Sequence, residues 1–100
     1  MVELKWDDRT LTAYLKGEID HHHAGELRRC IDEAIARAMP EVLCLDFGKV
    51  SFMDSSGIGL IMGRYRMMQE LGGIVTVQNA GKTLSKMMRL AGLERLVRLK

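Results

Sequence analysis

Two serines and an aspartate stand between an apolar strand and a glycine-rich helix, in the segment VSFMDSSGIGLIMG at residues 50–63. The continuous apolar run at residues 42–45 predicts a strand that is covered on both faces. A hydroxyl at a helix start lies beside unpaired backbone N–H groups and the positive end of the helix dipole, which together stabilise a phosphate group. Ser55 and Ser56 are therefore candidate phosphate carriers, and Asp54 is the expected N-cap of the helix.

Three glycines, Gly57, Gly59 and Gly63, weaken this predicted helix, because each glycine in a helix interior costs about 0.8 to 1 kcal/mol relative to alanine. Two interpretations stay open. The glycines either let the helix lie close to the sheet, or leave its first turns bare so that the active site of another protein can reach the serines.

Several motifs in this region resemble enzyme signatures but lack their context. The triplet Asp46-Phe47-Gly48 has no glycine-rich loop, lysine strand or HRD segment of a protein kinase beside it. The glycine spacing has one residue too many for a dinucleotide fingerprint, and the serines lack the G-x-S-x-G elbow of a hydrolase. We predict no catalytic residue and no cofactor. A nucleotide-binding or hydrolysing domain built on the serine and glycine turn is the alternative, which a test of ATP and GTP binding would decide.

Three consecutive histidines, His21, His22 and His23, follow Asp20. Neighbouring histidines point in different directions, and no further ligand at i+4 spacing completes a tetrahedral set, so we predict no metal site. The run instead indicates an exposed loop and helix start, whose protonation would make partner binding mildly pH-dependent.

The 100 residues, 47% of them hydrophobic, are enough for a single domain over residues 1–100. No apolar stretch approaches the roughly 18 to 20 residues of a membrane span, and the N-terminus shows no signal-peptide pattern, so we expect a cytoplasmic protein without membrane contact. Residues 1–60 carry seven basic and eleven acidic side chains, and residues 61–100 carry eight and two. The basic residues are scattered singly and aromatics make up only 5%, which argues against direct nucleic-acid binding.

The remaining pattern predicts the elements that position the serines. In chain order they are a hairpin of residues 2–6 and 11–17, a helix from about residue 20 to Pro40, a strand at 42–47 with a turn at Gly48-Lys49, a helix at about 56–71, a strand at 74–77, a helix at 82–91 and a strand at 96–99. The helix at 56–71 is expected to present one apolar side made of Ile58, Ile61, Met62, Tyr65 and Met68. The order ββαβαβαβ with right-handed crossovers predicts an α/β fold, a mixed sheet with an antiparallel edge and helices mainly on one face.

Three segments of the chain together resemble a known family. SFMDSSGIGLIMGRYR, preceded by GEIDHHHAGEL and followed by GGIVTVQNAGKTLSKMMRLAGLERL, is similar to the STAS domain of anti-sigma factor antagonists, most closely those of the sporulation pathway. The resemblance covers nearly the whole chain, and its D-S-[ST]-G block is specific because it follows an apolar strand. It implies the STAS fold and a regulatory switch, not an enzyme.

The resemblance also implies partners and site residues. In such proteins the unphosphorylated form binds an anti-sigma factor that is also a serine kinase, and a sigma factor is released. The kinase phosphorylates the first serine of the block, which corresponds to Ser55, and a PP2C-type phosphatase restores it. The expected docking surface is formed by Glu18, Asp20, His21, His22, Asp54, Ser56, Gly57 and Gly59. The alternative is a STAS-type interaction module of a lipid-transport or stress-sensing assembly, which needs no dedicated kinase.

Overall fold

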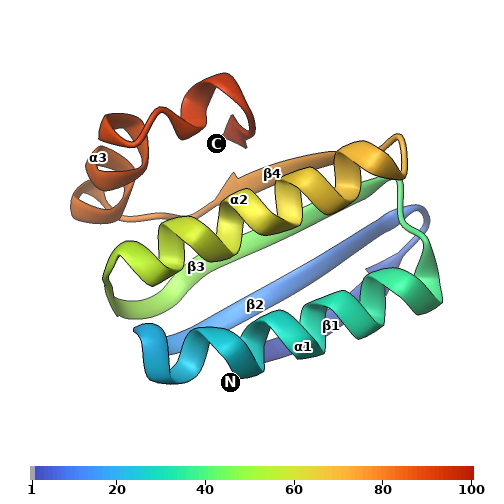
Figure 1. Cartoon of the computed structure of the whole chain (residues 1–100), viewed down its shortest axis with the longest axis horizontal. Helices are drawn as coiled ribbons and strands as arrows, with labels where there is room; N and C mark the ends of the chain where they lie inside the picture. The colour runs from blue at the N-terminus through green and yellow to red at the C-terminus, as the bar shows by residue number, and fades with distance from the viewer. Residues whose placement is uncertain (1) are drawn as a thin grey trace.

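Within residues 2–100, which the computed structural model describes, five strands form one mixed sheet and three α-helices join its parallel strands (Figure 1). The elements are β1 (Val2–Asp7), β2 (Thr10–Ile19), α1 (His21–Ala38), β3 (Val42–Met53), α2 (Ser55–Glu70), β4 (Ile74–Gln78), α3 (Lys82–Leu90), a 3₁₀ turn (Leu93–Arg95) and β5 (Arg98–Leu99). The predicted element order is confirmed.

The strands lie in the sheet in their sequence order, with β1 antiparallel to β2 and all later neighbours parallel. The helices α1 and α2 lie side by side across one face (Figure 1). This confirms the predicted mixed sheet with an antiparallel edge and helices mainly on one face. Among the helices of residues 2–100, none is both long enough and apolar enough to cross a bilayer.

The core fills the space between the sheet and these helices. On β2 the buried Leu11, Ala13 and Leu15 alternate with half-buried polar residues, so the two-residue period turns one face of the strand to the helices. On α1 the buried residues Leu27, Ile31 and Ile35 form an apolar stripe at helical spacing. Each fully buried side chain of this kind contributes roughly 1.5–3 kcal/mol relative to an exposed one, so this seam holds α1 on the sheet.

The strand β3 is longer than predicted. The prediction of a turn at Gly48-Lys49 is wrong, because both residues belong to this strand. Two register shifts against β2 explain why: β3 has one more residue than β2 between the pairs Tyr14↔Asp46 and Lys16↔Lys49, and one more again before Glu18↔Phe52. Such bulges absorb extra residues without ending a strand. The consequence is that β3 continues as far as the serine segment, where Met53 pairs with Ile19.

The buried side of α2 also differs from the predicted one. Ile61 and Met68 are buried as expected, but Ile58, Met62 and Tyr65 are only partly buried. The remaining buried positions of the helix are Gly57, Leu60 and Arg64. The reason is that α2 packs against α1 as well as against the sheet, which turns a second side of the helix inward. The helix ends close to the predicted residue 71, where Gly72 adopts a left-handed conformation with φ of 80°.

The last strand is shorter than predicted. The backbone N–H groups of Leu96 and Val97 both donate to the carbonyl of Leu93, at 2.9 Å each. These two residues therefore continue the preceding helical turn, and only Arg98–Leu99 pairs with β4.

The triplet that resembles a kinase motif has a structural role here. Asp46 points to the sheet face opposite the helices, is only 6% exposed, and accepts hydrogen bonds of 2.8 Å from Gly48 N–H, Gln78 Nε2 and Asn79 Nδ2. Burial alone would raise the pKa of Asp46, but these hydrogen bonds outweigh it and hold the pKa below its usual value. The carboxylate thus ties β3 to the end of β4.

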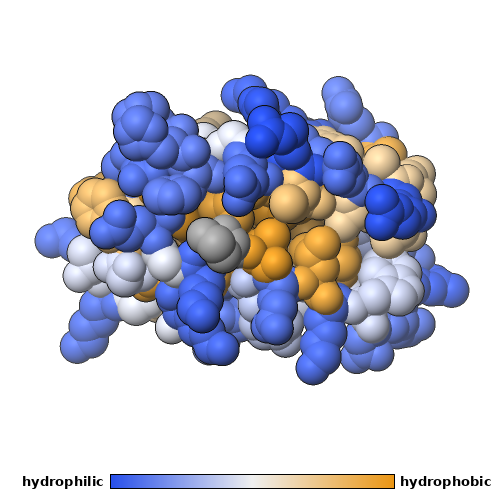
Figure 2. All heavy atoms as spheres, turned by 90° about the horizontal axis from the view of Figure 1, so that it is seen from below, coloured by the Kyte–Doolittle hydropathy of each residue, from blue (hydrophilic) through white to orange (hydrophobic). Residues whose placement is uncertain are grey.

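The strand β1 forms one edge of the sheet. Figure 2 looks at the molecule from below and shows hydrophobic residues lying between hydrophilic ones. Leu4 and Trp6 are the exposed large apolar residues of this strand, and they alternate with Glu3, Lys5 and Asp7. Charged side chains on an edge strand disfavour pairing with another edge, so this pattern protects the open side of the sheet.

Candidate functional site

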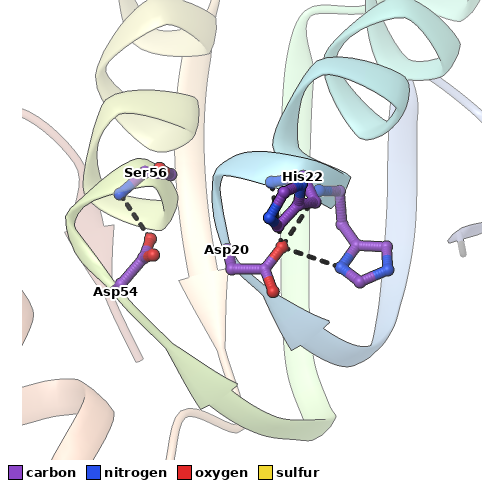
Figure 3. Close-up of polar contacts among 5 residues, drawn as sticks. Asp20, His22, Asp54 and Ser56 are labelled. Atoms are coloured by element: carbon purple, nitrogen blue, oxygen red, sulfur yellow. Dashed lines mark hydrogen bonds and ion pairs between the residues drawn. The ribbon is translucent and has the colours of Figure 1, made fainter.

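The starts of α1 and α2 lie next to each other, at the carboxyl ends of the parallel strands β2 and β3 (Figure 3). Asp20 follows β2 and Asp54 follows β3, and both have the extended backbone of an N-cap. The N–H of Asp54 donates to the carbonyl of Ile19 at 3.1 Å, which joins the two segments directly. The sheet register therefore brings two acidic helix caps to a single edge.

The carboxylate of Asp20 makes several contacts at the start of α1. Its Oδ1 accepts from the N–H groups of His22 at 3.0 Å and His23 at 3.1 Å, and lies 2.8 Å from His23 Nδ1. Burial alone would raise the pKa of Asp20, but the hydrogen bonds from His23 and His22 and the charge of His23 outweigh it and lower the pKa. Asp20 and His23 thus cap this helix start with contacts inside its own first turn.

The start of α2 is simpler. Asp54 Oδ1 accepts one hydrogen bond, from Ser56 N–H at 2.8 Å (Figure 3). Ser55 is the first residue of the helix and is exposed, whereas Ser56 is half-buried. The predicted capping role of Asp54 is confirmed, and Ser55 presents the more accessible of the two hydroxyl groups.

The structure separates the two explanations for the glycines. A Cβ at Gly57 would overlap Met53 Cγ and Sδ and come within 3.4 Å of Ile19 Cγ2, so this glycine permits close packing of α2 on the sheet. A Cβ at Gly59 or Gly63 would meet nothing within 4 Å. Packing on the sheet therefore explains Gly57, and the other two glycines leave open space.

The remaining residues predicted for the site lie around these helix starts. Glu18, His21 and His22 are all exposed, and the rings of His21 and His22 stand 4.1 Å apart between centroids. The histidines belong to the first turn of α1, and no part of the run forms a loop. Within residues 2–100 no group of three His, Cys, Asp or Glu side chains is placed to hold a metal ion.

Phe52 belongs to the same region and was missed in the sequence. It pairs with Glu18 across β2 and β3 and is 51% exposed. A groove of about 350 Å³ runs from Phe52 to Lys82 and Thr83 at the start of α3. The predicted turn at Gly48-Lys49 hid this feature, because it ended the expected strand at residue 47, before Phe52.

A mixed sheet of this strand order, joined by three helices, is the STAS fold. The STAS domain family matches residues 1–100, and the chain belongs to this family.

Relatives with assigned names extend over most of the chain. An anti-sigma F factor antagonist of Paenibacillus polymyxa is 33% identical over 96 residues, covering 96% of this chain and 82% of the relative. A protein of the same name from Lysinibacillus sphaericus is 34% identical over 84 residues, covering 84% and 72%.

Two solved structures of the anti-sigma factor antagonist SpoIIAA have the same fold. Its unphosphorylated form superposes with a TM-score of 0.86 at 32% identity, covering 100% of this chain and 88% of the other. The phosphorylated form of the Bacillus protein superposes with a TM-score of 0.78 at 32% identity, covering 100% and 91%. A similar protein thus exists with and without a phosphate group.

Proposed function

We propose that this chain is an anti-sigma factor antagonist that works by partner switching. Its unphosphorylated form binds an anti-sigma factor that is also a serine kinase, and a sigma factor is released. Phosphorylation by that kinase ends the complex, and a PP2C-type phosphatase restores the unmodified protein. The similarity to proteins named anti-sigma F factor antagonists over most of the chain supports this function.

The accessible hydroxyl of Ser55 is the observation that carries the proposal. Ser55 is exposed at the first position of α2, where the helix dipole favours an anionic group. Ser56 is half-buried, and its N–H is bound to Asp54. A kinase therefore reaches Ser55 with less rearrangement, and we assign Ser55 as the phosphoacceptor.

Electrostatics explains how a phosphate on Ser55 would act as a switch. The group adds about −1.5 to −2 charges beside Asp54, and the positive end of the α2 dipole partly offsets that repulsion. The folded domain should therefore tolerate the modification. A partner packed over the same surface would have to desolvate the dianion at a cost of several kcal/mol, and each 1.4 kcal/mol is tenfold in affinity.

The docking surface is assigned to the two neighbouring helix starts and the end of β3. Glu18, Asp20, His21 and His22 would contribute from one side, and Asp54, Ser56 and Gly59 from the other. Gly57 is buried, so its contribution is to hold α2 on the sheet. Phe52 adds an exposed aromatic side chain, a residue type that often anchors protein interfaces.

In this proposal the chain is the substrate of the phosphate transfer and does not catalyse it. The hydroxyl of Ser55 accepts the phosphoryl group, and the partner kinase supplies ATP and the catalytic groups. Because the switch depends on ATP and a sigma factor, we expect it to operate in the cytoplasm without membrane or nucleic-acid contact.

Phosphate mapping tests the assignment directly. The protein is incubated with its cognate kinase and ATP, and the modified residue is located by mass spectrometry in the wild type, Ser55→Ala and Ser56→Ala. We expect phosphate on Ser55 in the wild type and in Ser56→Ala, and none in Ser55→Ala. Phosphate found on Ser56 alone would refute the assignment of Ser55.

A further inference from the structure

A cavity of about 250 Å³ lies between α1 and α2, just behind the two helix starts. Its walls include Gly25 and Arg28 from α1 and Ser56, Gly59, Gly63 and Arg64 from α2. A single water needs only about 10–15 Å³ in the same kind of measure, so the cavity has room for a small ion together with several waters.

Three glycines line this cavity, although no neighbouring atom would clash with a side chain at their positions. A Cβ at Gly25, Gly59 or Gly63 would meet nothing within 4 Å, and none of the three has a left-handed backbone. Glycine is disfavoured relative to alanine in a helix interior, so three such positions around one cavity weaken both helices. Neither packing nor backbone conformation explains them, whereas the need for space does.

Arg64 is the second and independent feature of the cavity. The residue is only 6% exposed, its Nε forms an ion pair of 2.9 Å with Asp32 Oδ1, and the alignment of the two groups falls short of a hydrogen bond. Its Nη1 is buried without a hydrogen-bond partner. Buried polar groups in proteins are nearly always hydrogen-bonded, so a buried guanidinium nitrogen without an acceptor indicates a missing partner.

The charges around Arg64 do not balance. Burial lowers the pKa of Arg64, the carboxylate of Asp32 raises it, and the neighbouring positive charge of Arg28 lowers it again. Arg28 and Arg64 thus both line the cavity, and Asp32, the ion-pair partner of Arg64, lies outside its lining. An anion in that cavity would supply the second negative charge and an acceptor for the guanidinium groups.

We propose that the cavity between α1 and α2 binds an oxyanion, with Arg28 and Arg64 as its cations and the Ser56 hydroxyl as a further donor. A phosphate or carboxylate group has the planar pair of acceptor oxygens that a guanidinium group binds. Two sources carry this chemistry. One is a free phosphate compound. The other is a carboxylate side chain of a protein docked on the two helix starts, and this second source rests on the function proposed above.

The first experiment needs no partner. The full chain is titrated with inorganic phosphate, and with sodium chloride at matched ionic strength, while ¹H–¹⁵N NMR follows the backbone amides. Site-specific binding predicts saturable shifts at Gly25, Gly59 and Gly63 with phosphate only. Arg28→Gln should weaken phosphate binding at least tenfold, and Arg66→Gln, which removes the same charge from an exposed position of α2 outside the cavity, should leave it unchanged.

Gly63→Ala separates a binding role from a structural one. A methyl group at this position reduces the cavity and favours the helix, so the variant should unfold at a higher temperature while it binds phosphate at least tenfold more weakly. A glycine with a purely structural role would give lower stability or unchanged phosphate binding. The opposite signs of the two effects also exclude misfolding as the cause.

The second experiment measures the affinity of the same variants for the cognate anti-sigma factor in phosphate-free buffer. If inorganic phosphate does not bind, a loss of at least tenfold in both Arg28→Gln and Gly63→Ala, with Arg66→Gln unaffected, assigns the site to a carboxylate of the partner. If phosphate does bind, the oxyanion is a free compound whatever the partner does. Unchanged partner affinity together with no phosphate binding overturns the proposal, while leaving Ser55 as phosphoacceptor untouched.

Discussion

The starts of α1 and α2 each have an aspartate N-cap, and they differ in how many contacts that aspartate makes. Each has an aspartate cap after a parallel strand, and the backbone joins them through Asp54 N–H and the carbonyl of Ile19. Asp20 accepts from two backbone N–H groups and also contacts the ring of His23. Asp54 accepts from one N–H group.

The residues after the two caps sharpen the difference. In α1 the next residues are histidines, one of which folds back on the cap. In α2 they are an exposed serine, a half-buried serine and a buried glycine. The cap of α1 is therefore engaged by its own helix, whereas the start of α2 keeps an exposed hydroxyl group beside the positive end of the helix dipole.

In a small domain, a switch can be placed at one of two neighbouring helix starts. A group that changes its charge must sit where the fold tolerates both states, and a helix start with spare donors does so. A neighbouring start whose cap is already held by its own helix presents a surface that the modification does not change. We infer that α1 provides constant recognition and α2 provides the part that changes.

The largest expected effect comes from placing the same charge at the two matched positions. Ser55 and His21 are the first residues of α2 and α1, and both are exposed. Ser55→Asp should weaken binding to the cognate anti-sigma factor about 100-fold, equivalent to roughly 2.8 kcal/mol, and His21→Asp less than tenfold. Titration calorimetry with each variant measures this ratio.

Ser55→Ala is the control for loss of the hydroxyl group, and it should bind as tightly as the wild type. Equal losses for Ser55→Asp and His21→Asp would mean that the partner senses total charge, and the comparison between the two helix starts would then fail.

The next effect concerns the glycines of α2. Gly57→Ala should destabilise the fold by about 1–3 kcal/mol, because the added methyl group overlaps Met53. Gly59→Ala should stabilise it by about 0.5–1 kcal/mol, because the site is open and alanine favours a helix. Urea unfolding of the two variants gives both free energies. If both variants changed the unfolding free energy in the same direction, Gly57 and Gly59 would not differ in the roles assigned to them.

A smaller effect is expected at the cap of α2. Asp54→Ala removes the acceptor for Ser56 N–H and should cost about 1 kcal/mol of unfolding free energy. Asp54→Asn retains a capping oxygen and should stay within a few tenths of a kcal/mol of the wild type. Chemical unfolding distinguishes the two, and a large loss in Asp54→Asn would show that the charge itself, and not the cap, stabilises this helix start.

Much of the fold follows from the sequence because local patterns determine it. The alternation in β2, the stripe of α1 and the glycine after α2 each predict their element, and right-handed crossovers then predict a mixed sheet with an antiparallel edge. The failures have long-range causes. The bulges that carry β3 past Gly48 depend on its pairing with β2, and no local pattern at Gly48-Lys49 reports that pairing.

The candidate site was predictable where a residue acts through its own helix, as the caps Asp20 and Asp54 do. It was not predictable where contacts between elements decide the role. Arg64 reads as a solvated charge in the sequence but is buried between α1 and α2 beside Asp32. Likewise, Gly57 and Gly59 look alike in the sequence, and only the position of Met53 distinguishes them.

The smallest expected effect is the acid sensitivity of the α1 start. Because the pKa of Asp20 is lowered in the folded state, its ionised form stabilises the fold above the unfolded-state pKa of about 3.9, and this contribution is lost as the pH falls through the lower folded pKa. Asp20→Asn keeps a capping oxygen but has no charge to titrate. The thermal midpoint of the wild type should therefore fall more between pH 5 and about pH 2–3 than that of Asp20→Asn. Asp46 also has a lowered pKa, so both proteins should retain some acid sensitivity. Parallel curves for the two proteins would show that Asp20 is not the closed, charge-dependent cap on which the comparison with Asp54 depends.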